Sequence, residues 1–180
     1  MNMNLRQAKK LNTMKQFEEI KKEILERAHN ARACTIQYKR AYQSENLETL
    51  CNVIKDNFWW CCRNNVLDGE LIDKYKKIFS DNKIYHNVSI KSGFLLASGN
   101  STVQAYGNST VEAYGNSTVE AYDNSTVQAY DNSTVEAYDN SYINCRSTIE
   151  CVLKDNSIVR KWDTNTIQYV SDNLKFEKKY

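Results

Sequence analysis

The chain has 180 residues, no proline and only 5 glycines, and its 24 Lys and Arg residues nearly balance its 22 Asp and Glu residues. This length accommodates one ordinary domain or two small ones, and the scarcity of proline and glycine argues against long disordered linkers. No apolar run is long enough to cross a membrane, and the N-terminus lacks the apolar segment of a signal peptide. We therefore expect a cytoplasmic chain with no membrane partner.

Charge divides the sequence into regions of opposite sign. Residues 1–80 contain 15 Lys and Arg against 10 Asp and Glu, whereas residues 97–144 contain no basic residue and 6 acidic ones. This asymmetry predicts two modules with different surfaces. The basic excess is smaller than that of typical nucleic-acid-binding domains, so a solvated helix face explains it better than direct nucleic-acid binding.

The first half of the sequence has the periodicity of helices. Apolar residues recur every three or four positions over residues 5–28, again over 47–62, and in the run "GELIDKYKKIF" at 69–79. This spacing places the apolar side chains on one stripe of each helix. We predict a helical domain over residues 1–82, with a short additional helix over 34–42.

The segment "FWWCC" at 58–62 interrupts this pattern with consecutive aromatic residues. Adjacent side chains on a helix point in different directions, so Trp59 or Trp60 must face something other than its own helical core. Contact with the adjoining repeat domain is the simpler interpretation, and a binding hot spot for an external partner is the alternative. Cys61 and Cys62 lack the spacing of a zinc-binding pair, and we interpret all six cysteines as thiols in a reducing compartment.

The second half of the chain repeats an octapeptide with the consensus A-Y-[GD]-N-S-T-V-[EQ]. A fixed short period predicts a solenoid of stacked coils. Val and Ala should point inward and Thr, Tyr and Glu or Gln outward, because the opposite arrangement would bury a column of carboxylates. One strand and one turn per octad predict a flattened coil of about 16 residues, and a triangular coil of about 24 residues is the alternative.

The predicted fold class is therefore α+β, with an N-terminal helical domain followed by a narrow β-solenoid over residues 83–170. Near its end the octad pattern decays, and Cys145 and Cys151 stand at the Ala position while branched residues stand at the Val position. These replacements are typical of a packed core. The charged and aromatic tail at 171–180 is predicted to be a cap over the open strand edge. The branched residues that stand at the Val position of the decaying octads are Ile143, Ile149 and Ile167.

The octads and the helical segment before them carry a resemblance to a known group. The segments "ENLETL", "VIKDNFWWC" and "GELI", together with the octads, resemble a group of uncharacterised octapeptide-repeat β-solenoid proteins of gut bacteria and their phages. The match covers roughly residues 40–170. This resemblance implies a solenoid and a bacterial host cell, and it implies no mechanism.

No motif for catalysis or cofactor binding is found. The sequence has no G-x-S-x-G, no glycine-rich phosphate loop and no H-E-x-x-H. A column of equivalent carboxylates also lacks the two different environments that acid–base catalysis needs. We therefore predict that the protein is not an enzyme and binds no cofactor or metal.

Three functional hypotheses remain. The leading one is a non-enzymatic protein–protein interaction module that presents a rigid acidic surface of Tyr, Thr and Glu columns, because Tyr binds at low entropic cost. The alternatives are a phage-encoded inhibitor that mimics nucleic acid against a host defence protein, and a structural solenoid that assembles into homo-oligomers. The candidate protein-binding residues are Tyr106, Tyr114, Tyr122, Tyr130, Tyr138, Glu112, Glu120, Glu136, Trp59 and Trp60.

Overall fold

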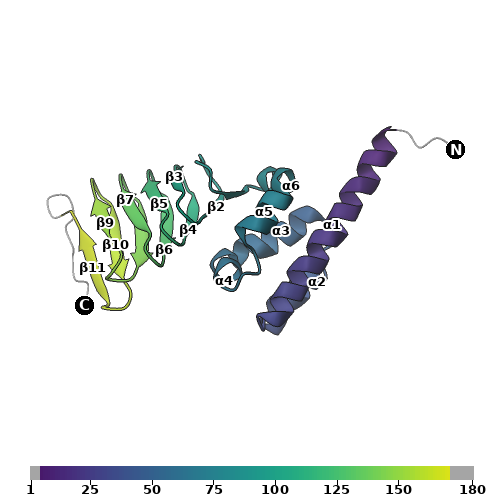
Figure 1. Ribbon diagram of the computed structural model, residues 1–180, viewed down its shortest axis with the longest axis horizontal. Coiled ribbons are helices and arrows are strands. Elements are labelled where there is room, and N and C mark those ends of the chain that lie inside the picture. The colour runs from purple at the N-terminus through teal and green to yellow at the C-terminus, as the bar shows by residue number, and fades with distance from the viewer. Residues whose placement is uncertain (1–4, 171–180) are drawn as a thin grey trace, which may run out of the picture. The chain divides into compact units, whose positions relative to one another are not determined.

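A computed structural model describes residues 5–170 (Figure 1). It confirms the predicted fold class, because a helical region is followed by a β-solenoid. The chain divides into two compact units, one ending at Asp68 and the other beginning at Gly69. This division falls before the last two helices, whereas the sequence placed it after residue 82. The predicted cap at 171–180 lies outside the described residues.

Four helices make up the first unit over its described residues, 5–68. The apolar stripe of the longest helix is buried from Phe17 onward, with Ile20, Ile24 and Ala28 following at helical spacing. The third helix begins with a capping box, because the Asn46 side chain accepts from the Thr49 backbone N–H at 2.9 Å and the Thr49 hydroxyl accepts from the Asn46 N–H. The bounds are α1 (Leu5–Asn30), α2 (Thr35–Tyr42), α3 (Leu47–Asp56) and α4 (Phe58–Arg63).

The second unit begins with α5 (Gly69–Lys74) and α6 (Lys76–Asp81), which pack against the first strand. The strands then stack one coil after another (Figure 1). Their bounds are β1 (Ile84–His86), β2 (Phe94–Ala97), β3 (Thr102–Ala105), β4 (Thr110–Ala113), β5 (Thr118–Ala121), β6 (Thr126–Ala129), β7 (Thr134–Ala137), β8 (Tyr142–Cys145), β9 (Cys151–Leu153), β10 (Ile158–Lys161) and β11 (Thr166–Tyr169).

Successive octads alternate between two sheets. Sheet A has the order β1-β2-β4-β6-β8-β10-β11, and sheet B has the order β3-β5-β7-β9. Within sheet B, Thr118 pairs with Thr134 in parallel register, a separation of 16 residues. The flattened coil is therefore confirmed and the triangular alternative is wrong. The last strand, β11, reverses direction and pairs antiparallel with β10.

The solenoid core contains the predicted Val and Ala columns and also a serine column that the sequence analysis did not place inside. Val119 and Ala121 are fully buried. Each serine sits at a corner, and a hydrogen bond to the nearby backbone makes burial tolerable for Ser109, Ser125, Ser133 and Ser157. Ser125, for example, donates to the Tyr122 carbonyl at 2.7 Å. The buried serines are Ser109, Ser117, Ser125, Ser133, Ser141 and Ser157.

The turns explain why the third octad position is Gly in the first three octads and Asp in the next three. This position has positive φ, 64° at Gly107 and 57° at Asp123, which Gly adopts freely and Asp tolerates. Asp adds a bond between coils, since the Asp139 carboxylate accepts from the Asp123 backbone N–H at 3.0 Å. The following Asn residues form their own column, as in the bond of 3.1 Å from Asn116 to Asn100.

Two predictions for the irregular last coil were wrong. Cys145 pairs with Ala129 as predicted, but Cys151 pairs with Val135 and therefore takes a Val position. The shortened segment before Cys151 shifts its register. Ile167, predicted to point into the core, is 56% exposed because it lies on the reversed strand β11.

Candidate functional site

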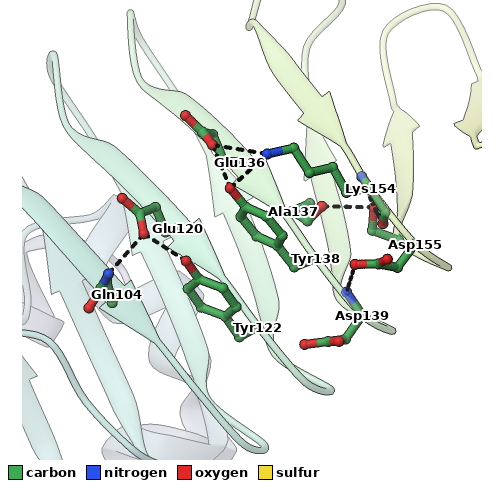
Figure 2. A network of polar contacts seen from close by, with 10 residues as sticks. Gln104, Glu120, Tyr122, Glu136, Ala137, Tyr138, Asp139, Lys154 and Asp155 are labelled. Carbon is green, nitrogen blue, oxygen red and sulfur yellow. Dashed lines mark hydrogen bonds and ion pairs between the residues drawn. The ribbon is translucent and has the colours of Figure 1, made fainter.

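The outer side of sheet B brings together part of the predicted binding residues. We call the surface formed by Gln104, Glu120, Glu136, Tyr106, Tyr122 and Tyr138 the tyrosine–glutamate face. Each tyrosine hydroxyl on it donates to the Gln or Glu two residues earlier, at 2.8 Å from Tyr122 to Glu120 and 2.7 Å from Tyr138 to Glu136 (Figure 2). The Gln104 amide also donates to Glu120 at 2.9 Å.

The tyrosine rings of this face are stacked along the solenoid. Ring centroids are 4.8 Å apart between Tyr106 and Tyr122 and 4.6 Å apart between Tyr122 and Tyr138, with interplanar angles of 9° and 11°. The spacing matches the distance between hydrogen-bonded strands. Stacking leaves the rings half-buried, so the surface presents ring edges and polar groups held in fixed positions.

Lys154 occupies the tyrosine position of the next coil and ends this stack. Its Nζ lies 4.5 Å from the Tyr138 ring centroid and donates to the Tyr138 hydroxyl at 3.0 Å. The same ammonium is 3.9 Å from a Glu136 carboxylate oxygen (Figure 2). A cation over a ring face is favourable, so Lys154 substitutes for a fourth ring while bringing positive charge to one end of the face.

The hydrogen bonds of the face also fix its protonation. Donation from Gln104, and then from Tyr122, lowers the pKa of Glu120 below its usual value. Conversely, the bond to Glu120 raises the pKa of Tyr122 to about 12. At neutral pH the face therefore presents an ionised carboxylate at Glu120 beside a neutral, oriented phenol.

The outer side of sheet A corrects the prediction for Glu112, which is fully buried rather than outward and exposed. Leu96, its partner in register on the preceding strand, is also buried, so this side is shielded from water at its first strands. Burial raises the pKa of Glu112 to about 8, and it is mainly uncharged at neutral pH. Tyr114 and Tyr130 stack on this side at 4.9 Å.

The predicted tryptophan site lies in the first unit, on α4. Trp59 is 37% exposed, and the Arg63 guanidinium lies 5.3 Å from its ring centroid. Trp60 is half-buried, and both tryptophans line an apolar pocket of about 370 Å³ together with Ile24 and Tyr38. Contact of the tryptophans with the repeat domain stays a prediction.

A hydrogen-bonded chain of Asp, His and Ser lies where the second unit begins, and sequence reasoning missed it. His86 Nδ1 is 2.9 Å from Asp73 Oδ2, and His86 Nε2 is 2.9 Å from Ser98 Oγ. These contacts have the order of an orienting acid, a base and a nucleophile. However, a Cβ at Gly69 would collide with the imidazole, so backbone packs directly on the ring, and the hollow of about 20 Å³ beside His86 is too small for a substrate. We interpret the chain of contacts as a structural link between α5, the end of β1 and Ser98, which directly follows β2.

A second cluster missed by the sequence analysis lies inside the last coil. Lys161, buried at 5% exposure, directs its Nζ toward the sulfur atoms of Cys145 and Cys151. The octad alignment contained the signal, since "KWDTNTIQ" places Lys161 at the Ala position. Within residues 5–170, by contrast, no group of three or more His, Cys, Asp or Glu side chains is arranged to hold a metal ion.

No helix in the described part of the chain is both long enough and apolar enough to span a bilayer. Comparisons with protein-family models, curated proteins and solved structures gave no match.

Proposed function

We propose that the protein is a non-enzymatic protein-binding module and that the tyrosine–glutamate face of sheet B is its contact surface. The main support is the preorganisation of this face. Its tyrosines are stacked at 4.8 and 4.6 Å and their hydroxyls are already bonded to Gln or Glu. A partner that docks on fixed side chains avoids much of the entropic cost of ordering them.

The charges of the face indicate what kind of partner it suits. Glu120 and Glu136 lie in register on neighbouring strands, with carboxylates on the same side of sheet B. Two carboxylates about 4.8 Å apart along the axis suit Arg or Lys side chains, flanked by aromatic edges that accept apolar contact. We therefore propose a protein partner with a basic docking segment.

The experiment is a pull-down with the tagged full chain from a bacterial lysate treated with nuclease, followed by affinity measurements on the recovered protein. The test variant is Tyr122→Ser/Tyr138→Ser, and the matched control is Tyr114→Ser/Tyr130→Ser on sheet A. We expect at least about a 10-fold loss of affinity for the sheet B variant, as for hot-spot aromatics, and little loss for the control. Equal losses in the two variants would contradict the assignment of the face.

The non-enzymatic part of the proposal has its own test. The Ser98, His86 and Asp73 contacts are the arrangement that most resembles a catalytic one among the described residues. We expect the full chain to hydrolyse an activated acetate ester no faster than the Ser98→Ala variant does. A rate that drops on this substitution, together with labelling of Ser98 by a fluorophosphonate, would show that the protein is an enzyme.

Two further hypotheses stay as alternatives. Acidic mimicry draws less support, because Glu112 is buried and successive coils space their carboxylates by about 4.8 Å, against one charge per roughly 1.7 Å of DNA. Light scattering of the purified chain tests self-assembly directly. A monomer at high concentration would exclude the homo-oligomeric solenoid and leave the binding module.

A further inference from the structure

The last coil contains a charged side chain where every earlier coil has a small apolar one. Lys161 pairs in register with Cys145, which pairs with Ala129, so all three occupy one inward column. The Lys161 Nζ donates to the Ile149 carbonyl at 2.6 Å and lies 3.4 Å from Cys145 Sγ. It also lies 3.6 Å from Cys151 Sγ.

A buried ammonium group is costly unless a negative charge or several acceptors compensate it. The Nζ contacts of Lys161 comprise one carbonyl oxygen and two sulfur atoms. A thiolate on either cysteine would supply the opposite charge. The Lys161 ammonium therefore favours ionisation of one of these two thiols, although the same column contains no charged side chain in the other coils.

The two cysteines are also neighbours of each other, across the core between the two sheets. Cys145 lies on β8 of sheet A and Cys151 on β9 of sheet B, with their sulfur atoms 3.6 Å apart. A disulfide needs about 2.05 Å, so a closure of about 1.5 Å joins them. Cys151 is only half-buried, and reagents can reach the pair from its side.

The environment of this pair differs from that of the other buried cysteines. A hydrogen bond from Cys151 and the nearby Lys161 charge lower the pKa of Cys145 to about 7, while its role as donor raises the pKa of Cys151. By contrast, burial raises the pKa of Cys51 to about 11 and of Cys61 to about 12. Thiolate is the reactive form of cysteine, so reactivity is concentrated at this pair.

We propose that Cys145, Cys151 and Lys161 form a thiol–disulfide exchange site whose substrates are low-molecular-weight disulfides. The accessible Cys151 passes its proton to the Cys145 thiolate and attacks one sulfur of the substrate, which releases the first thiolate and leaves a mixed disulfide on Cys151. Cys145 then attacks Cys151 Sγ and its proton goes to the second released thiolate. Starting from one thiol and one thiolate, the two cysteines lose two electrons and one proton in total, and the disulfide substrate becomes one thiolate and one thiol.

Lys161 stabilises the negative charge on whichever sulfur carries it, because its Nζ lies within 3.6 Å of both. The product disulfide would connect sheet A to sheet B inside the last coil. Oxidation would thereby fasten the C-terminal end of the solenoid without altering its outer faces.

The test uses the full chain incubated with oxidised glutathione, quenched with acid, alkylated in denaturant and digested with trypsin without reduction. Arg146 lies between the two cysteines, so the disulfide joins a peptide ending at Arg146 to "STIECVLK" at 147–154. We expect this cross-linked pair to appear at least about 10-fold faster than glutathione adducts of Cys51 and Cys61. Thiols at 145 and 151 that stay reduced, or a mixed disulfide that never closes, would overturn the proposal.

Three variants sharpen the measurement made on the natural chain. Lys161→Met should slow formation of the cross-linked pair at least about 10-fold, whereas Lys77→Met, at an exposed lysine on α6, should leave its rate unchanged. Cys61→Ser should also leave it unchanged, because that thiol lies elsewhere. An unchanged rate in a folded Lys161→Met chain would overturn the assignment of Lys161 to the site. The result with the natural sequence decides the cysteine chemistry even if this variant does not fold.

Discussion

The regular octads of residues 97–144 and the coil that follows them share a backbone path and differ in what they enclose. In the octads the inward columns contain only Val, Ala, Ile and Ser, all buried. In the next coil the same columns receive Cys145, Cys151 and Lys161. The uniform octads therefore form an unreactive scaffold, and the reactive side chains lie in the coil whose sequence departs from the consensus.

The sharpest way to break this comparison is to move the lysine two positions back in its column, past Cys145 to Ala129. Ala129→Lys would place an ammonium group among apolar side chains without the sulfur contacts of Lys161 and would also overpack the core. We expect a loss of about 4 kcal/mol or more in the free energy of unfolding. Urea unfolding followed by circular dichroism measures it. A cost below about 1 kcal/mol would show that the octad core tolerates charge as well as the last coil does.

The octads themselves are not all equivalent, and Glu112→Gln tests this. Burial raises the pKa of Glu112 from 4.5 to about 8, so the native state favours its protonated form. The contribution of Glu112 to stability should be most favourable below about pH 4.5 and should fall as the pH rises toward 8. The variant lacks this titration, and we expect it to be more stable by about 2–4 kcal/mol near pH 9.

The control for this pH profile is Glu120→Gln. The pKa of Glu120 is lowered by its hydrogen bonds, so its contribution to stability is present above the unfolded pKa and disappears as the pH falls. The two glutamates occupy the same octad position and should give pH dependences of opposite sign. Identical profiles from unfolding curves would contradict the buried state of Glu112.

The turns provide a smaller effect. Asp139 has a φ of 53° and accepts the Asp123 backbone N–H, so Asp139→Ala loses both a tolerated left-handed residue and a bond between coils. We expect a cost of about 2 kcal/mol. Asp139→Gly keeps the backbone conformation and should cost about half as much. If the glycine variant is the less stable one, the role assigned to positive φ is wrong.

The smallest expected effect compares two hydroxyls within one tyrosine stack. Tyr122→Phe removes a donor to the Glu120 carboxylate, whereas Tyr106→Phe removes a donor to the neutral Gln104 side chain. Charge-assisted hydrogen bonds are stronger, so we expect a cost of about 1 kcal/mol at Tyr122 and less at Tyr106. Thermal unfolding of the two variants in parallel distinguishes them.

The sequence allowed prediction of every feature that depends only on the octad. The consensus alone led to the Val and Ala core, the outward tyrosines and the coil of two octads, because alternation and turn chemistry act within one unit. It could not predict that Glu112 is fully buried while Glu120 is only half-buried, since the same residue letter stands at both positions. That difference depends on position along the stack, where Leu96 lies beside Glu112.

The last coil shows the opposite limitation. Its register cannot be obtained from the consensus, because the segment between Cys145 and Cys151 is shorter than an octad, and so Cys151 was assigned to the wrong column. The octad "KWDTNTIQ" places Lys161 at the Ala position, yet the sequence analysis drew no conclusion from a lysine there. A simple count of charged residues at inward positions would have found the site.

Because strands pair at a separation of 16 residues, the eight-residue unit of the gene is only half of the structural unit. Recombination between nearly identical octads would add or remove eight residues at a time. An odd step would transfer every downstream side chain to the opposite sheet, which would carry Cys145 from sheet A to sheet B and reverse the two surfaces beyond the change. An even step would only lengthen or shorten the stack. The length of such a protein can therefore change by pairs of octads without altering its surfaces. Selection on those surfaces must instead conserve whether the number of octads is odd or even.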